Sequence, residues 1–146
     1  MIYYKQLYIN FLNSLKDELS LYKNEKNIWI LTGGISNTPG NLCLHICGNL
    51  KHFYGAVIGN TGYIRDRDLE FSQKNISRDE LIRVVEETKE MIGKIFDELT
   101  PEDINKIYPL DKFGDKATYG FIFSRLVSHL AYHLGQINYH RRILDN

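Results

Sequence analysis

Hydrophobic residues recur at intervals of three or four positions along most of the chain, which is the period of an amphipathic helix. Four segments carry this pattern: residues 2–22, 39–58, 77–99 and 118–144. No alternation of polar and apolar residues is long enough to predict a strand, and no segment repeats another. Four amphipathic helices of about 20 residues pack most simply as a four-helix bundle. We therefore expect an all-α fold, with residues 1–146 forming one domain.

Local signals mark where two of these helices begin. Pro39 suits the first turn of the second helix, with Asn37 or Thr38 as its cap. Ser77 and Glu80 form a capping box at the start of the third helix. The expected inward positions of the first two helices are Leu7, Phe11, Leu15, Leu19, Tyr22, Leu42, Ile46, Leu50, Phe53, Val57 and Ile58.

The connections between the helices are longer than an up-and-down bundle needs. Each has about 15–20 residues, whereas connections in compact bundles have about 2–8. We expect at least one of them to cross the end of the bundle or to form the mouth of a pocket.

Composition and charge exclude several classes of partner. Hydrophobic residues make up 43% of the chain and charged residues 25%, as in an ordinary globular domain. Because 18 basic residues balance 18 acidic ones, no net charge favours binding to nucleic acid or to an anionic membrane. No apolar run approaches the roughly 20 residues that cross a bilayer, and the first residues lack the features of a secretion signal. A cytoplasmic location is expected.

The two cysteines, Cys43 and Cys47, do not form a recognisable metal or disulfide motif. They lie four residues apart on one predicted helix, where Cβ atoms are about 5–6 Å apart. A disulfide prefers about 3.8 Å. We expect both to be small buried apolar residues.

The last predicted helix carries a row of polar residues on an otherwise apolar segment, "SHLAYHLGQINYH". His129, His133, Gln136 and His140 follow one another at steps of four, three and four, which places them on one face of a helix. Arg125 extends the row by one turn. On the second helix, a similar row contains His45, Asn49 and His52.

Two histidines four residues apart on a helix can direct imidazole nitrogens at one metal ion, at about 2.0–2.1 Å. A third imidazole from a neighbouring helix would leave one or more open positions for water or substrate, and His45 is our choice. Cys43 and Cys47 lie two residues to either side of His45, so a helix that directs His45 at the ion turns both sulfurs away.

Structural roles for these polar residues are also open. Bundle histidines can bond backbone carbonyls or the hydroxyl groups of tyrosines, of which the chain has ten. His52 and His140 suit the surface or the support of other ligands better than direct coordination. Arg125 is either a solvated helix residue or the holder of an anionic group at a pocket rim.

Three segments together resemble the DinB-like superfamily of metal-binding four-helix bundles. They are "HICGNLKHF", "RDRDLEF" and "SHLAYHLGQINYHRR", in this order along the chain. The nearest likeness is to an uncharacterised branch with segments of the form kHlaGN, RxRDxEF and HxxYHxGQI. The matching positions are His45 with Gly48-Asn49, Arg65 to Phe71, and His129 to Ile137. The resemblance covers the chain from about Pro39 to its C-terminus.

The resemblance implies that His45, His129 and His133 bind a divalent metal ion and that the protein is a homodimer. Several relatives use the metal in reactions of low-molecular-weight thiols. We therefore expect a transferase that holds a small thiol as its thiolate for attack on an electrophilic carbon. Asn49 and Gln136 would orient the ligand or the imidazoles. Carboxylates of the thiol would be held by Arg125, Arg65 or Arg67, although the run from Arg65 to Asp68 also suits a cluster of salt bridges at a helix end.

Two other functions remain open at this point. One is metal-dependent hydrolysis, which is disfavoured because no buried carboxylate is evident near the histidines to act as a general base. The other is a stress-related protein that binds metal or a small ligand without turnover. Zinc, nickel, cobalt and iron all suit three imidazoles, so the identity of the metal stays open.

Overall fold

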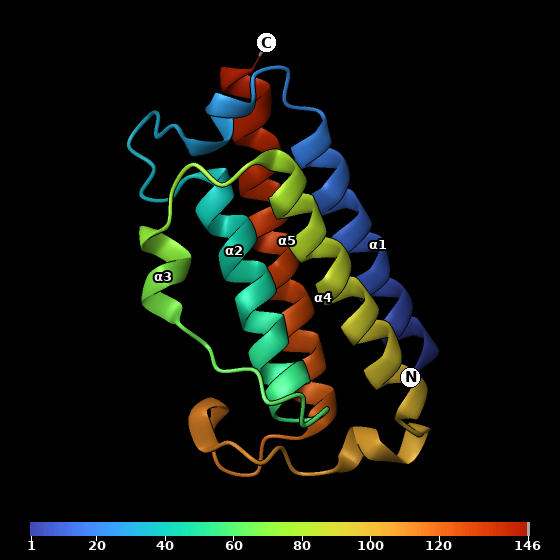
Figure 1. The fold of residues 1–146 in the computed structure, drawn as a ribbon. Coiled ribbons are helices and arrows are strands. Elements are labelled where there is room, and N and C mark those ends of the chain that lie inside the picture. The colour runs from blue at the N-terminus through green and yellow to red at the C-terminus, as the bar shows by residue number, and fades with distance from the viewer. Residues whose placement is uncertain (146) are drawn as a thin grey trace.

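A computed structural model describes residues 1–145 of the chain, and every regular element within them is a helix. Four long helices lie side by side (Figure 1): α1 Ile2–Ser20, α2 Pro39–Leu50, α4 Arg78–Glu98 and α5 Tyr119–Leu144. Both α1 and α2 pack against α4 and α5. The all-α class is therefore confirmed. Within residues 1–145, no helix is both long enough and apolar enough to cross a bilayer.

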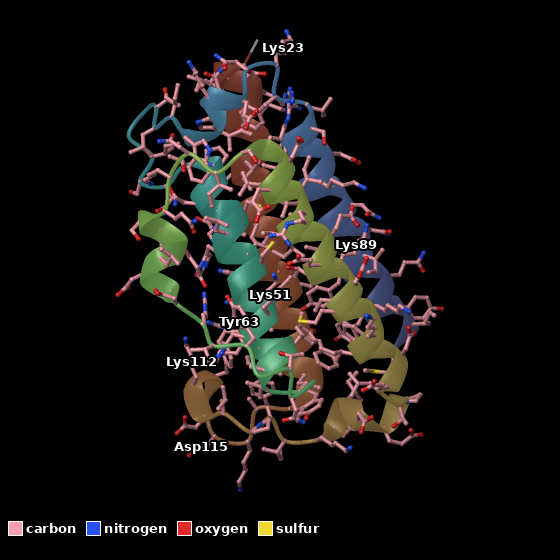
Figure 2. The ribbon with its side chains drawn as sticks, viewed as in Figure 1. Lys23, Lys51, Tyr63, Lys89, Lys112 and Asp115 are labelled. Atoms are coloured by element: carbon pink, nitrogen blue, oxygen red, sulfur yellow. The ribbon has the colours of Figure 1, made fainter. Side chains whose placement is uncertain are left out.

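The long connections between the helices follow different paths. Helices α1 and α5 run in one direction and α2 and α4 in the other (Figure 1). Because α2 and α4 are parallel, the chain between them must return along the outside of the bundle. This return contains the short helix α3, Arg67–Ser72, which packs against α2. The connection from α4 to α5 carries Lys112 and Asp115 at the end of the bundle away from the C-terminus (Figure 2).

The predicted caps are confirmed. The side chain of Thr38 accepts a hydrogen bond from the Asn41 amide, with Pro39 in the first turn of α2. Ser77 accepts from the backbone amide of Glu80 and begins α4, but the Glu80 carboxylate is bonded to Arg83, so only one half of the predicted capping box forms. Each cap satisfies one of the backbone donors that an α-helix leaves unpaired at its start. The sequence therefore sets the beginnings of these two helices locally.

The apolar pattern predicted that the second helix continues as an α-helix to Ile58. This prediction is wrong. The helix becomes a π-helical segment over Lys51–Ala56, with the amide of Val57 bonded to the carbonyl of His52. The hydroxyl group of Tyr108 donates to the carbonyl of Phe53 at 2.7 Å, which stabilises the wider turn from outside. Such insertions turn the following side chains relative to the α-helical register.

The core is formed by the apolar faces of all four long helices. The predicted inward positions Leu15, Leu19 and Tyr22 are buried, but the prediction for Leu7 is wrong. Leu7, expected to point inward, is 43% exposed, whereas its neighbour Tyr8 is completely buried. The ring of Tyr8 contacts Tyr54 and Phe96, and its hydroxyl group donates to the carbonyl of Phe123. A tyrosine is acceptable inside the core because its single polar atom has this partner.

The α1 face predicts a clear contrast between two leucines. Leu12→Ala should lower the free energy of unfolding by about 2–5 kcal/mol, because Leu12 is fully buried and its loss leaves a cavity. Leu7→Ala should cost at most about 1 kcal/mol. Chemical denaturation of the two variants measures both values, and equal losses would contradict the observed face of α1.

Candidate metal centre

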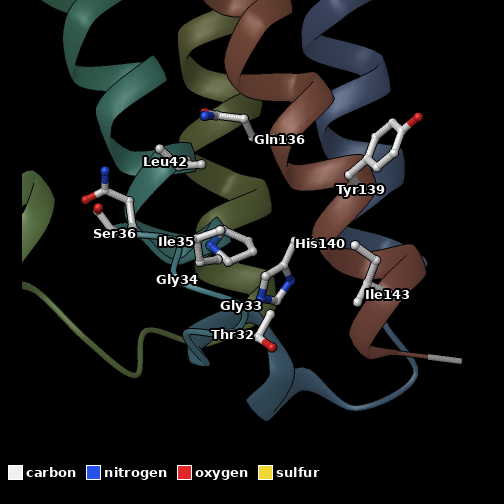
Figure 3. A pocket seen from close by; sticks show the side chains of 12 residues that line it. Thr32, Gly33, Gly34, Ile35, Ser36, Leu42, Gln136, Tyr139, His140 and Ile143 are labelled. Atoms are coloured by element: carbon white, nitrogen blue, oxygen red, sulfur yellow. The ribbon is translucent and has the colours of Figure 1, made fainter.

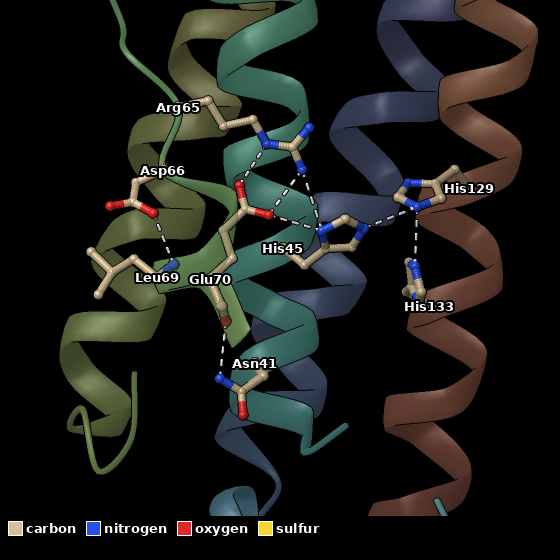
Figure 4. Close-up of polar contacts among 8 residues, drawn as sticks. All are labelled: Asn41, His45, Arg65, Asp66, Leu69, Glu70, His129 and His133. Carbon is tan, nitrogen blue, oxygen red and sulfur yellow. Dashed lines mark hydrogen bonds and ion pairs between the residues drawn. The ribbon is translucent and has the colours of Figure 1, made fainter. Parts of the chain in front are cut away.

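Three imidazole rings meet between α2 and α5 (Figure 4). His45 comes from α2, and His129 and His133 come from successive turns of α5. The Nε2 atom of His129 lies 3.2 Å from Nε2 of His45 and 3.1 Å from Nε2 of His133. One ligand atom from each of the three residues falls within 4.8 Å of the other two. The structure thus brings together the three histidines that the sequence singled out.

The outer nitrogen of two of these rings faces a hydrogen-bond acceptor. Nδ1 of His45 lies 2.9 Å from Oε2 of Glu70, and Nδ1 of His133 lies 2.6 Å from Oε1 of Gln136. A carboxylate and an amide oxygen only accept, so both Nδ1 atoms carry a hydrogen. Nη2 of Arg65 also lies near Nδ1 of His45, but at 3.3 Å it is farther away than the Glu70 oxygen and its own hydrogen is donated to that carboxylate. In the neutral ring the other nitrogen, Nε2, then carries a lone pair. Both lone pairs point at His129.

The three Nε2 atoms therefore hold at most one hydrogen between them when all rings are neutral. That hydrogen, on Nε2 of His129, can point at only one of its two neighbours, so at least one close pair of nitrogens has no hydrogen bond. If the hydrogen is on Nδ1 of His129 instead, both pairs oppose lone pair to lone pair. A shared cation would satisfy all three nitrogens. Two ligands of a tetrahedral ion at about 2.0–2.1 Å lie about 3.3 Å apart, close to the observed 3.1–3.2 Å.

The environment favours neutral rings. The pKa of His129 is lowered to about 4, chiefly by burial and to a smaller extent by the neighbouring groups His133, His45, Arg65 and Arg125. Burial also lowers the pKa of His133, although its hydrogen bond to Gln136 acts in the opposite direction. Metal ions bind the neutral imidazole. Both rings of α5 are thus in the binding form near neutral pH.

A buried carboxylate supports His45 from behind, contrary to the expectation from sequence. Glu70, on α3, is only 6% exposed. Arg65 binds it with two parallel hydrogen bonds, Nε to Oε1 at 2.7 Å and Nη2 to Oε2 at 2.8 Å (Figure 4). Burial would raise the pKa of Glu70, but the hydrogen bonds from Arg65 and His45 outweigh it and hold the pKa below its usual value. The carboxylate therefore stays ionised and fixes the orientation of the His45 ring.

Helix α3 can pack closely against α2 because a glycine stands on α2 at the point of contact. A side chain at Gly48 would overlap Oε1 of Glu70 and lie 2.8 Å from its Cδ atom. Two turns away, the side-chain amide of Asn41 donates to the carbonyls of Glu70 and Gln73. Gly48 and Asn41 thus allow the short helix α3 to pack against α2, with the carboxylate of Glu70 directed at His45.

The run from Arg65 to Asp68 has a different role from the predicted cluster of salt bridges. Asp66 caps α3 by accepting from the amide of Leu69, and Arg65 pairs with Glu70 rather than within the run. Sequence reasoning missed Glu70 because a six-residue helix in a charged segment shows too little periodicity to assign. Its position in the RxRDxEF segment, next to the histidine motifs, was the available signal.

A cavity of about 740 Å³ opens on the other side of the cluster. His45 and His129 line it, together with Asn49 and Arg125 from the predicted rows. Gln136 does not line it; its side chain is bonded to His133 and borders the second cavity described below. A ligand in this cavity reaches the imidazoles directly, with Asn49 and Arg125 beside it.

The remaining polar residues singled out by sequence lie outside the cluster. His52 is half-buried and its ring contacts Phe53 edge to face. His140 lines a second cavity of about 480 Å³ near the C-terminal end of α5 (Figure 3). Its ring is bonded on both sides, to the hydroxyl group of Tyr22 and the carbonyl of Ile30. Cys43 and Cys47 are buried and unbridged, as predicted.

The packing of α3 on α2 predicts opposite effects for two glycine substitutions. Gly48→Ala should lower the free energy of unfolding by about 1–3 kcal/mol, because the added methyl group displaces Glu70 from its place against α2. Gly135→Ala should raise it by about 0.5–1 kcal/mol, because that position on α5 has open space and alanine is the better helix former. Thermal or chemical unfolding measures both, and a neutral Gly48→Ala would contradict the close approach of α3.

Comparison with known proteins gives a family but no activity. No curated protein matches the sequence. The family model described as "Protein of unknown function (DUF1572)" matches residues 6–146, which include α3 and all three histidines of the cluster. Because the match spans nearly the whole chain, this protein belongs to the DUF1572 family.

Proposed function

We propose that this protein is a DinB-like four-helix bundle that binds one divalent metal ion through His45, His129 and His133. The observation that carries the proposal is the close approach of three Nε2 atoms, two of which present lone pairs to the third. The acceptors behind His45 and His133 hold those rings in the tautomer that a metal requires. Zinc, nickel, cobalt and iron all suit this set of ligands.

The proposed activity is transfer of a low-molecular-weight thiol to a small electrophile. A divalent ion in this site would act as a Lewis acid that makes a thiol or water at its open side more acidic. Side chains of the protein position the ligand rings and face the substrate. Glu70 and Gln136 hold the rings of His45 and His133, and Asn49 and Arg125 face the cavity through which substrates reach the cluster.

Hydrolysis is a weaker candidate, even though the structure contains a buried carboxylate. Both oxygens of Glu70 are engaged by Arg65 and His45, on the side of the His45 ring away from Nε2. A general base must lie within hydrogen-bond reach of the proton that it removes. Glu70 therefore serves as a positioning residue for His45. Metal or ligand binding without turnover is the third candidate, and the experiments below distinguish the three.

The expectations about substrate, partners and location stay predictions. We expect a small thiol as substrate, a homodimer, no nucleic-acid partner and a cytoplasmic location. Three large apolar side chains on α5, those of Tyr132, Tyr139 and Ile143, are 64–66% exposed, and they belong to the surface at which a second copy would be sought first.

Metal content tests the proposed site. The purified protein should contain close to one equivalent of divalent metal by elemental analysis, because the ligand atoms of the three rings already lie within 4.8 Å of one another. His45→Ala, His129→Ala and His133→Ala should each lose most of it, since each removes a ligand. His52→Ala is the matched control and should retain the metal, because His52 lies outside the cluster.

A variant of Glu70 distinguishes a residue that binds the metal from one that only positions a ligand. Glu70→Gln should weaken metal affinity by about 10–100-fold without abolishing it, as expected when the partner of a ligand is altered. Competition with a chromophoric chelator measures this affinity. Equal metal content in the parent and all three alanine variants would remove the proposed site.

Thiol dependence tests the proposed activity. We expect loss of a model electrophile, 1-chloro-2,4-dinitrobenzene, to require both metal-loaded protein and an added thiol such as cysteine. The His129→Ala variant should fall to the uncatalysed rate. Turnover of ester substrates without thiol would favour hydrolysis instead, and metal occupancy with neither reaction would favour the non-catalytic alternative.

A further inference from the structure

The cavity over the histidine cluster has a strongly positive lining. The basic residues Arg65, Arg67, Lys112 and Arg125 line it, and no acidic residue does. The chain as a whole has a formal net charge of zero, so this concentration of positive charge is local. Clefts lined by one sign of charge concentrate ligands of the opposite sign.

Three of the four cations have no acidic partner. Arg67, Lys112 and Arg125 form no ion pair with any residue in the described range 1–145. Arg65 differs, because its guanidinium is committed to Glu70. Of the arginines that sequence suggested for binding carboxylates, we therefore favour Arg67 and Arg125, and we add Lys112.

Aromatic rings hold these cations at the wall of the cavity. The guanidinium of Arg125 lies 5.3 Å from the centre of the Phe113 ring, and Nζ of Lys112 lies 5.2 Å from that of Phe53. Contact with the face of a ring positions a cation without using its N–H groups. Those donors stay available for a ligand.

A buried polar group also faces this cavity. Asn49 lines it and is only 8% exposed, yet its side-chain amide makes no hydrogen bond within the described part of the chain. The atoms of this amide still open onto the cavity, so its donor and its acceptor are available to a ligand. Asn49 lies one turn after His45 on α2, as Arg125 lies one turn before His129 on α5. The cations and the amide thus surround the open side of the cluster.

We propose that the cavity binds a small organic anion whose carboxylate or phosphate group is held by Arg125 and Lys112. Its uncharged body would lie against Phe113 and Phe121, which also line the cavity, with Asn49 as a further hydrogen-bond partner. Arg125 precedes His129 by one helical turn, about 6 Å, so the far end of such a ligand reaches the cluster. This inference names the substrate class of the proposed metal site and rests on that function only for the reaction, since the anion contacts need no metal.

Binding of three matched probes tests the proposal. The probes are 3-phenylpropionate, phenyl phosphate and the uncharged 3-phenylpropan-1-ol, titrated into isotope-labelled full-length protein and followed by NMR. The titration is done with protein as purified and again after metal removal. We expect at least one anion to bind about tenfold or more tightly than the alcohol in both preparations, with shifts centred on residues 111–113 and 121–129. The better anion tells a carboxylate site from a phosphate site.

Charge variants locate the binding group. Arg125→Gln and Lys112→Gln should each remove most of the preference for the anion while leaving binding of the alcohol unchanged. Lys116→Gln removes the same charge from the same connection, but Lys116 does not line the cavity, so this control should retain the preference. Melting temperatures within a few degrees of the parent check that each variant folds.

Two results would overturn the inference. One is equal affinity for the anions and the alcohol. The other is an equal loss in the Lys116 and Lys112 variants, which would mean attraction to surface charge in general. Because the metal-free protein is tested as well, anion preference without any metal binding would leave this inference standing while removing the proposed function. Metal binding without anion preference would do the reverse.

Discussion

The site depends on the close approach of three imidazole nitrogens in a half-buried space between two helices. Hydrogen bonds from Nδ1 to Glu70 and Gln136 leave lone pairs on Nε2 of His45 and His133, and both meet Nε2 of His129 at 3.1–3.2 Å. A protein gains nothing from such an arrangement through hydrogen bonding alone, because too few hydrogens are available. A cation shared by the three nitrogens makes the arrangement favourable. Burial lowers the pKa of His129 and of His133 and so keeps these two rings in the neutral form that a cation binds.

The surrounding elements follow from this requirement. Helix α5 supplies two rings one turn apart, and α2 supplies the third. The return segment carries α3 across α2 so that Glu70 lies directly behind His45, with Arg65 keeping the carboxylate ionised. Gly48 provides the space for this approach. The long connection between α2 and α4 is therefore part of the site rather than a simple link.

Periodicity along the chain predicted the four long helices and the starts of α2 and α4, because these features are set by residues close together in sequence. It also grouped His129 with His133 correctly. It placed Leu7 inside although Tyr8 lies there, since both positions are apolar and only packing against α4 and α5 decides between them. It could not reveal α3 or Glu70, because their role depends on contact with a helix some 25 residues earlier. The cations of the cavity likewise come from three separate segments, and only the fold brings them together.

X-ray absorption spectroscopy of the metal-loaded protein tests the central claim most directly, since it reports the atoms bound to the ion. We expect three imidazole nitrogens at about 2.0–2.1 Å, completed by oxygen from water or buffer, with no sulfur. A sulfur scatterer at about 2.3 Å would assign the ion to Cys43 or Cys47 instead. A shell of oxygens without the imidazole signature would also contradict the account, because it would place the metal away from His45, His129 and His133.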